Sequence, residues 1–221
     1  MNSKTEDILG KLTLVVIFSY FTAKQATSVI ALLNTPWGFD NWLLVLASRS
    51  ASLAFLALIL VLTITRLPPT DSAAGIEPRI SSIIGTFALT ILVLLPTGSV
   101  GPTLLVISIV MVILGTLASV YCLYFLGRSF SIMASARALV TSGPYGIVRH
   151  PLYLAEALTV LGIIIANWSV AAVAVGAIQI AFQFRRMQNE ERVLRNAFPE
   201  YEHNYAKKVP MIVPFLRPRA A

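Results

Sequence analysis

Long apolar segments alternate with short polar ones along most of the chain. A helix that crosses a bilayer needs about 20 predominantly apolar residues, and the last apolar segment is too long for one crossing. Asn167 and Trp168 divide it into the two halves of a tight hairpin. The pattern predicts an all-α integral membrane protein with six transmembrane helices, or five if the hairpin only dips into the bilayer. The apolar segments lie near residues 8–33, 41–65, 80–96, 102–126 and 151–184.

Two longer polar segments occupy the second half of the chain. Residues 127–150 mix Ser, Gly and Arg and are too polar to span, and Pro151 suits the first position of the next helix because its missing N–H costs nothing there. Beyond residue 184 a charge-rich amphipathic helix should continue from the last span until Pro199 ends or kinks it. We therefore expect two parts: residues 1–126 with four transmembrane helices, and residues 127–221 with the loop, the helical hairpin and a cytosolic tail helix.

The charge distribution predicts the orientation of these helices. Charged residues make up 12% of the chain, where a soluble domain has about 25%. Fifteen of the 17 Lys and Arg residues fall in the N-terminal segment, the 66–79 and 127–150 loops and the tail. Cytoplasmic loops carry such an excess, so both termini are expected in the cytoplasm, at the inner membrane if the host is bacterial. The net charge of +7 then reports topology and attraction to anionic lipid. No aromatic-interleaved basic motif indicates nucleic-acid binding.

Three residues stand out within the apolar segments. Lys24 and Arg49 each lie about eight residues from the outer end of a span. Snorkelling to the outer interface accounts for such charges, and a polar cavity or a bound lipid headgroup is the alternative. Cys122 is the single cysteine and reads as a small buried hydrophobic side chain.

The start of the 151–184 segment carries polar residues on one face. On a helix His150, Tyr153 and Glu156 share a sector of about 120°. Glu156 then lies inside the bilayer, where an unpaired carboxylate is costly, so it needs a partner or a cavity. An interfacial His–Tyr belt with Glu156 bonded to a neighbouring helix would also explain the pattern.

The tail helix has a second polar pair on its apolar face. Arg186 and Glu190 are spaced i, i+4 and point toward the protein, whereas a solvated pair of this kind would only support the helix. A partly buried Arg held by a Glu presents a fixed fork to a carboxylate or phosphate. A structural clamp that pins the tail to the body is the other interpretation.

Several common motifs do not occur in the sequence. Neither GxGxxG nor GxxxxGK[ST] is found, and His150 and His203 lack the His or Cys partners of a metal site. No nucleophile–base–orienter arrangement is evident. These patterns favour a diffusible cofactor bound without a Rossmann glycine loop, beside a polar site at the cytosolic interface.

Two motifs resemble a known family. The stretches "GPYGIVRHPLYL" and "RRMQNEERVLRNAF", the latter followed by Tyr residues and "VPMIVPFL", are similar to the GPYxxVRHPxY stretch, the RxxxEE helix and the VPxxxP end of isoprenylcysteine carboxyl methyltransferases and their phospholipid N-methyltransferase relatives. The resemblance covers roughly residues 140–216. Membrane sterol reductases also end with an RHPxY-like stretch and a VP-containing tail.

The resemblance implies S-adenosylmethionine bound on the cytosolic side, which would make residues 127–221 the cofactor-binding catalytic region. The acceptor would be a lipid or isoprenoid carboxylate, with Arg186 and Glu190 shaping its site; an amine acceptor would need a base such as Glu156. Gly146 and Pro199 depart from the family pattern, and Pro199 predicts a different bend in the tail. The residues that the resemblance assigns to the cofactor are Tyr145, Val148, His150, Tyr153 and Glu191.

Two other functions remain open from the sequence. An NADPH-dependent reductase of an isoprenoid or sterol-like lipid would use Tyr153 and Glu156 as proton donors. A non-catalytic lipid-binding or transport protein is the third alternative. Binding of the methyl donor, of NADPH or of neither would separate the three.

Overall fold

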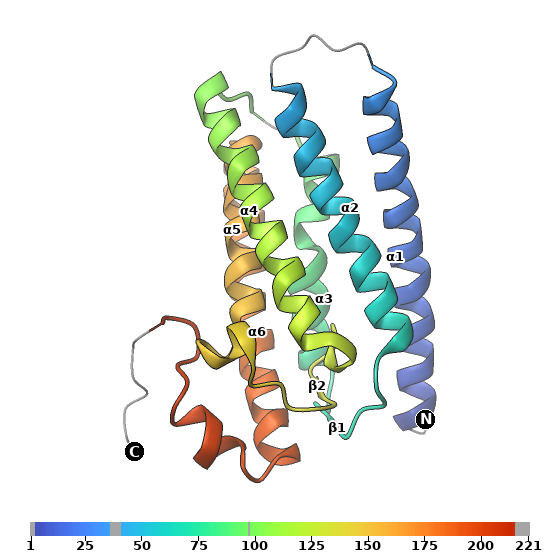
Figure 1. Cartoon of the computed structure of the whole chain (residues 1–221), viewed down its shortest axis with the longest axis vertical. Helices are drawn as coiled ribbons and strands as arrows, with labels where there is room; N and C mark the ends of the chain where they lie inside the picture. The colour runs from blue at the N-terminus through green and yellow to red at the C-terminus, as the bar shows by residue number, and fades with distance from the viewer. Residues whose placement is uncertain (1–2, 36–40, 97, 215–221) are drawn as a thin grey trace.

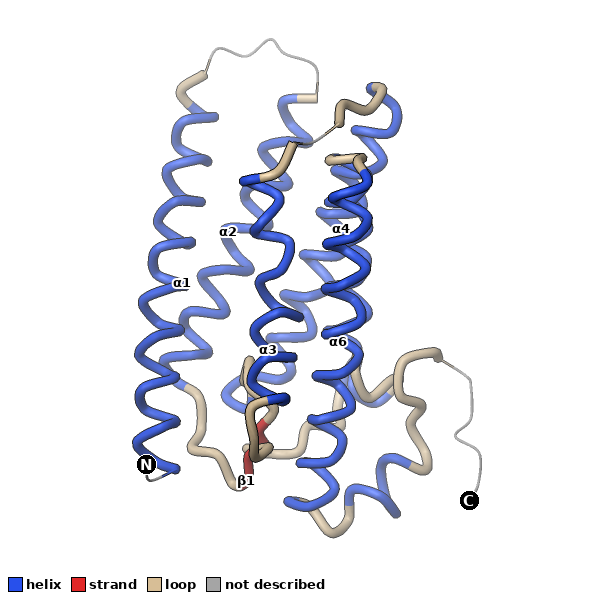
Figure 2. The backbone as a smooth tube through the Cα atoms, turned by 180° about the vertical axis from the view of Figure 1, so that it is seen from behind, coloured by secondary structure: helices blue, strands red, loops and turns tan. Residues whose placement is uncertain are grey.

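Six helical segments run side by side along the length of the molecule (Figures 1 and 2). The computed structural model describes residues 3–35, 41–96 and 98–214. The 3-10 helix η1 follows α3 directly. The segments are α1 (Ser3–Leu33), α2 (Trp42–Thr65), α3 (Glu77–Phe87) with η1 (Ala88–Leu94), α4 (Pro102–Leu126), α5 (Pro151–Ala166) and α6 (Val170–Ala197).

Length and hydropathy identify this bundle as a multi-pass membrane protein. Within the described residues five helical segments are long and apolar enough to cross a bilayer, and α5 is a shorter apolar helix of 16 residues. At 1.5 Å per residue α5 is about 24 Å long, slightly less than a typical hydrocarbon core. The predicted all-α membrane fold with a helical hairpin is confirmed, and the structure has five long helical segments and one shorter helix, α5, in the hairpin.

The hairpin of α5 and α6 turns where the sequence predicted. The backbone N–H of Asn167 donates to Ile163 O at the end of α5. Ser169 then caps α6, because its side-chain oxygen accepts a hydrogen bond from Ala172 N at 3.1 Å. The helix continues without a break into the charged tail and ends at Ala197, two residues before Pro199.

The polar loops gather at one end of the bundle, which we call the site end. It holds the start of α1 and the end of α6 (Figure 1). Here the strand β1 (Asp71–Ser72) pairs antiparallel with β2 (Ser135–Ala136) and joins the 66–79 loop to the 127–150 loop. The remaining short elements are η2 (Gly127–Ser129), η3 (Gly143–Gly146) and the π-helical turn η4 (Tyr201–Ala206).

A buried charge cluster ties α1 to these loops. The Asp7 carboxylate lies 2.7 Å from Arg66 Nη2 and 3.0 Å from Arg137 Nη2. Arg137 also donates to the carbonyl of Leu67. Burial lowers the pKa of Arg66, and the neighbouring charge of Arg137 adds to this effect. One carboxylate therefore compensates two buried guanidinium groups.

The charges inside α1 and α2 have local contacts. Arg49 Nη1 donates to the side-chain oxygen of Ser28 at 2.7 Å, and Gln25 Nε2 donates to Arg49 O at 3.0 Å. Lys24 Nζ lies 5.9 Å from the centre of the Tyr20 ring. Arg49 therefore bridges α1 and α2 instead of only snorkelling. In α4, Cys122 is buried and forms no disulfide bond.

Close packing of α4 against α5 predicts that replacing Gly115 with alanine lowers stability, whereas replacing Gly10 does not. A Cβ atom on Gly115 would lie 2.7 Å from Thr159 N and 2.8 Å from Ala155 O, whereas one on Gly10 would meet nothing within 4 Å. Gly115→Ala should therefore destabilise the protein by about 1–3 kcal/mol. Gly10→Ala should be neutral or slightly stabilising. Thermal unfolding of both variants in detergent tests this expectation, and equal melting temperatures would contradict it.

Candidate functional site

The loop before α5 and the C-terminal tail meet at the site end. The backbone N–H groups of Arg149 and His150 donate to Pro210 O and Met211 O at 2.9 and 3.1 Å. The hydroxyl of Tyr205 donates to the carbonyl of Tyr145 at 2.6 Å. These three hydrogen bonds hold the tail against the Arg-His-Pro corner, so two stretches about 60 residues apart form one wall.

Glu191 holds this corner together from inside the fold. Its buried carboxylate lies 2.5 Å from Arg149 Nη1 and 2.8 Å from His150 Nε2. Tyr201 OH donates to it at 2.7 Å, and Arg195 Nη2 lies at 3.3 Å. Four groups from the loop, the helix and the tail therefore share one acidic side chain.

Tyr153 connects this corner to the Arg186–Glu190 pair. Its hydroxyl donates to Glu190 Oε1 at 2.6 Å, and its ring centre lies 5.6 Å from that of His150. The guanidinium carbon of Arg186 lies 5.1 Å from the Tyr153 ring centre. The imidazole and the guanidinium therefore flank the same aromatic ring.

Arg186 is fixed by contacts from three elements. Its Nε lies 3.4 Å from Glu190 Oε1, an ion pair without hydrogen-bond geometry. Nη1 donates to Thr86 Oγ1 at 3.2 Å, and Nη2 donates to Ser131 O at 3.0 Å. The side chain is 6% exposed. A charged group held this firmly presents a fixed geometry to a ligand.

Three tyrosines of the loop and the tail remain neutral donors. Burial raises the pKa of Tyr145, Tyr201 and Tyr205 above the usual range of a phenol. Tyr201 and Tyr205 donate within the fold, as described above. Within the described part of the chain the buried hydroxyl of Tyr145 has no hydrogen-bond partner. It is therefore available to a bound molecule.

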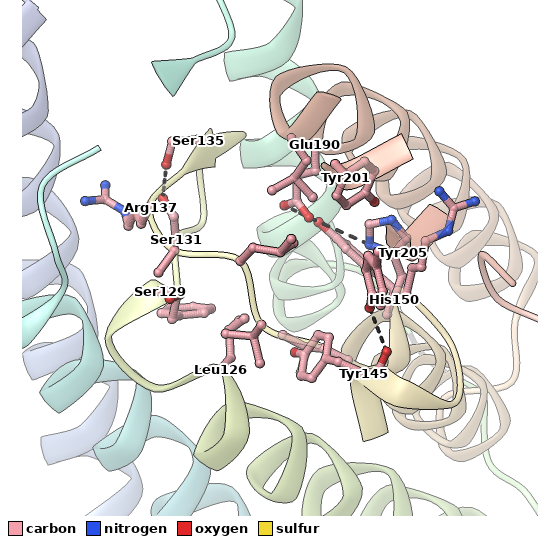
Figure 3. A pocket seen from close by; sticks show the side chains of 18 of the residues that line it. Leu126, Ser129, Ser131, Ser135, Arg137, Tyr145, His150, Glu190, Tyr201 and Tyr205 are labelled. Carbon is pink, nitrogen blue, oxygen red and sulfur yellow. Dashed lines mark hydrogen bonds and ion pairs between the residues drawn. The ribbon is translucent and has the colours of Figure 1, made fainter. Parts of the chain in front are cut away.

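A polar cavity of about 90 Å³ lies between the loop, the start of α5 and the tail. Figure 3 shows Glu190, His150 and the three tyrosines on one side of it and Ser129, Ser131 and Ser135 on the other. Arg186 also lines this cavity. We call this space the polar cavity.

A second, mostly apolar space of about 350 Å³ lies within the bundle, and we call it the interior cavity. The aromatic and aliphatic side chains of its wall come from α1, α2, α3, η1, α4, α5 and the 127–150 loop. Glu156 and Gln183 also line it, and Gln183 Nε2 donates to Glu156 Oε2 at 2.9 Å. Arg186 lines both the interior cavity and the polar cavity. It therefore stands between a cavity lined mainly by polar and charged residues and a mostly apolar one.

Most of the residues singled out in the sequence meet at these two cavities, and two of them lie behind the wall. Val148 is buried without lining either cavity, and Glu191 contacts His150 from the far side. Those that line a cavity are Tyr145, His150, Tyr153, Glu156, Arg186 and Glu190.

Other residues of the site were missed by the sequence reasoning. Gln179 and Gln183 line the interior cavity, and their i, i+4 spacing within an apolar segment was the signal that could have revealed them. Arg149 and Tyr205 were identified only as parts of motifs. Thr86 and Ser131, which hold Arg186, carry no sequence signal of their own.

The fold and the site define a class of protein: a multi-pass α-helical membrane protein with a polar cavity at one end that adjoins an apolar cavity inside the bundle. The family model "Phospholipid methyltransferase" matches residues 97–201. This match confirms the resemblance drawn from the two motifs.

Three curated relatives are similar to about half of the chain. The cobalt-zinc-cadmium resistance protein CzcN of Cupriavidus metallidurans is 38% identical over 119 residues, or 53% of this chain and 52% of that protein. The nickel-cobalt-cadmium resistance protein NccN of Alcaligenes xylosoxydans xylosoxydans is 29% identical over 53% of each chain. Protein-S-isoprenylcysteine O-methyltransferase B of Arabidopsis thaliana is 32% identical over 48% of this chain and 57% of that protein. The chain thus spans about half the length of these relatives.

Proposed function

We propose that the protein is a membrane methyltransferase that uses S-adenosylmethionine to methylate a lipidic acceptor at the cytosolic face of the membrane. The position of Arg186, at the boundary between the polar and interior cavities, carries this proposal. A water-soluble donor and a membrane-soluble acceptor must meet at such a boundary. The family match and the isoprenylcysteine methyltransferase relative support the same reaction class.

The residues around the polar cavity fit the methyl donor. When bound, S-adenosylmethionine supplies an electrophilic methyl group on a cationic sulfur. The Glu190 carboxylate and the aromatic face of Tyr153 suit a cation, and Tyr145 has an unused hydroxyl. Ligand pockets commonly enclose about 300–1,000 Å³, more than the 90 Å³ of this cavity. The cavity must therefore widen when the donor binds.

In this proposal residues 127–221 form the cofactor-binding catalytic region on the helices of residues 1–126. Tyr145, His150 and Tyr153 contact the donor. Val148 contributes to the loop behind them, and Glu191 positions His150 from behind. Both termini are then cytoplasmic, in agreement with the Lys and Arg distribution.

The acceptor is best explained as the carboxylate of an isoprenylcysteine-like molecule or of another isoprenoid or lipid. Arg186 offers a guanidinium fork to that carboxylate, and Glu190 fixes the fork. A carboxylate is already nucleophilic at neutral pH, so these residues need mainly to orient it and exclude water. The apolar wall of the interior cavity would hold the hydrocarbon part.

An amine acceptor is the second candidate, because Glu156 also lines the interior cavity. Its carboxylate, held by Gln183, could take the proton that an ammonium group must lose before it attacks. Incubation of the purified protein with labelled donor and a total lipid extract separates the two. A labelled methyl ester identifies the carboxylate acceptor, and a labelled methylamine identifies the amine.

Donor binding should depend on His150 and not on the other histidine. His150→Ala removes a buried side chain that lines the polar cavity, and donor affinity should fall at least about tenfold. His203→Ala changes an exposed residue and should leave donor affinity as it is. Calorimetry of each protein with S-adenosylmethionine in detergent measures the difference.

The same titration tests the other functions. Binding of NADPH instead of the methyl donor would replace the proposal with a lipid reductase. Binding of neither molecule by the wild-type protein would favour a non-catalytic lipid-binding protein. Equal donor affinity in the His150 and His203 variants would refute the assignment of the polar cavity to the donor.

A further inference from the structure

Two apolar spaces lie on opposite sides of the junction between α3 and η1. The interior cavity is on one side. On the other side is an open groove of about 510 Å³ between α3, η1 and α6, which we call the outer groove. Phe87 and Thr90 line both spaces and therefore form the partition between them. The outer groove is otherwise lined by Ile83, Ile84, Ala88, Ile91, Leu94, Val175 and Ile178.

The partition coincides with a change of helix type. The α-helix α3 ends at Phe87, and η1 continues for seven residues as a 3-10 helix. Runs of 3-10 helix longer than three or four residues are uncommon and often mark a hinge. The backbone N–H of Leu89 donates to Gln179 Oε1 of α6 at 2.8 Å, and Thr90 Oγ1 donates to Phe87 O at 2.6 Å. Side chains therefore help to hold the backbone at this junction.

The Phe87 side chain can move without an electrostatic cost. Its ring centre lies 6.1 Å from that of Phe18 on α1, at an interplanar angle of 33°. The ring has no polar atom, and both spaces beside it are mostly apolar. A change of its rotamer exchanges one set of apolar contacts for another.

The two spaces connect the bilayer to the candidate site. Ile83 and Ile91 in the outer groove are each 48% exposed in the membrane-facing surface. The interior cavity also reaches Arg186 and Glu156. A molecule that spans both spaces would have hydrocarbon in the groove and a polar head at Arg186.

We propose that Phe87, with Thr90, is the gate through which the hydrocarbon chain of a single-chain lipid passes from the bilayer into the interior cavity, between η1 and α6. The occupant is an acyl or isoprenoid chain with an anionic head, and its head group pairs with Arg186. This inference rests on the proposed function for the role of the head group. The passage itself rests on the two cavities and the partition that they share.

Photo-crosslinking tests the gate directly. The probe is palmitate with a diazirine in its chain, and the protein is placed in nanodiscs of phosphatidylcholine and phosphatidylglycerol. Adducts are located by mass spectrometry. Thr116 and Ser119 line the interior cavity and are 5% and 2% exposed, so the surrounding bilayer cannot label them. Ile178 lines the outer groove and reports chains that have not passed the gate.

Two substitutions of Phe87 should act in opposite directions. Phe87→Trp should lower labelling of Thr116 and Ser119 at least about fivefold, which corresponds to the smallest typical cost of overpacking. Labelling of Ile178 should stay unchanged. Phe87→Ala should raise the initial rate of interior labelling. Ile91→Trp adds the same ring at a residue that lines only the outer groove and should leave interior labelling at the wild-type level.

The experiment can disprove the gate at Phe87 without affecting the methyltransferase assignment. No labelling of Thr116 and Ser119 in the wild-type protein would overturn the gate, as would interior labelling that is the same in the wild-type and Phe87→Ala proteins. The Phe87→Ala comparison decides the question if the tryptophan variant does not fold. Calorimetry with the methyl donor on the same samples separates the two claims, because gating without donor binding would overturn only the proposed function.

Discussion

Glu191→Ala is expected to destabilise the protein by about 3–5 kcal/mol, the cost of removing one partner from a buried charge pair, and to abolish donor binding. The substitution leaves Arg149 and His150, which are 9% and 5% exposed in their side chains, without their shared carboxylate. It also removes the acceptor of the Tyr201 hydroxyl. The tail should then detach from the Arg-His-Pro corner. Thermal unfolding in detergent and calorimetry with the donor measure the two effects.

Glu202→Ala is the matched control. Glu202 pairs with Arg195 on the surface, where the two side chains are 46% and 47% exposed. Exposed pairs contribute at most about 1 kcal/mol, so this variant should unfold near the wild-type temperature and bind the donor normally. If Glu191→Ala were as stable as Glu202→Ala, Glu191 would not hold the corner together.

Arg186→Ala is expected to lower the rate of methyl transfer by roughly 100- to 1,000-fold, as the loss of an oriented donor does in other enzymes. Arg186 lies at the boundary of the two cavities and is held by Thr86, Ser131 and Glu190. In the proposed function, its removal would leave the carboxylate of the acceptor without a partner. The assay is transfer of labelled methyl groups into the lipid extract, with calorimetry to check donor binding.

Arg185→Ala provides the control from the neighbouring position. Arg185 is 46% exposed and pairs with Glu77 on the surface, so its loss should change the transfer rate less than about threefold. Arg186→Lys keeps the charge but loses the planar fork, and its rate should fall between those of the wild type and Arg186→Ala. A wild-type rate in Arg186→Ala would remove Arg186 from the proposed mechanism.

Periodicity was sufficient to predict the helices and the faces that they bury. The turn at Asn167 follows from the polar break in an over-long apolar segment, and the end of the tail helix follows from Pro199. The inward orientation of Arg186 follows from the spacing of apolar residues. Successive helical positions differ by about 100°. This explains why Glu190 lines the polar cavity while Glu191 faces Arg149.

Contacts between distant segments could not be predicted in this way. The pairing of Asp71 with Ala136 involves strands of two residues each, too short for an alternating pattern. The contact of Arg186 with Thr86 depends on how closely α3 approaches α6, and Gly85 permits that approach. The interior cavity is likewise a property of packing among several helices and has no sequence pattern of its own.

The Asp7 cluster limits how far the chain can be shortened. The family match begins at residue 97, yet Arg137 inside the matched region depends on Asp7 and on Leu67 O from outside it. Arg186 likewise depends on Thr86. A fragment limited to residues 97–201 would leave Arg137 without Asp7 and Leu67 O, and Arg186 without Thr86. The first three helices are thus an integral scaffold for the matched half, and residues 97–201 alone are not expected to fold as an independent unit.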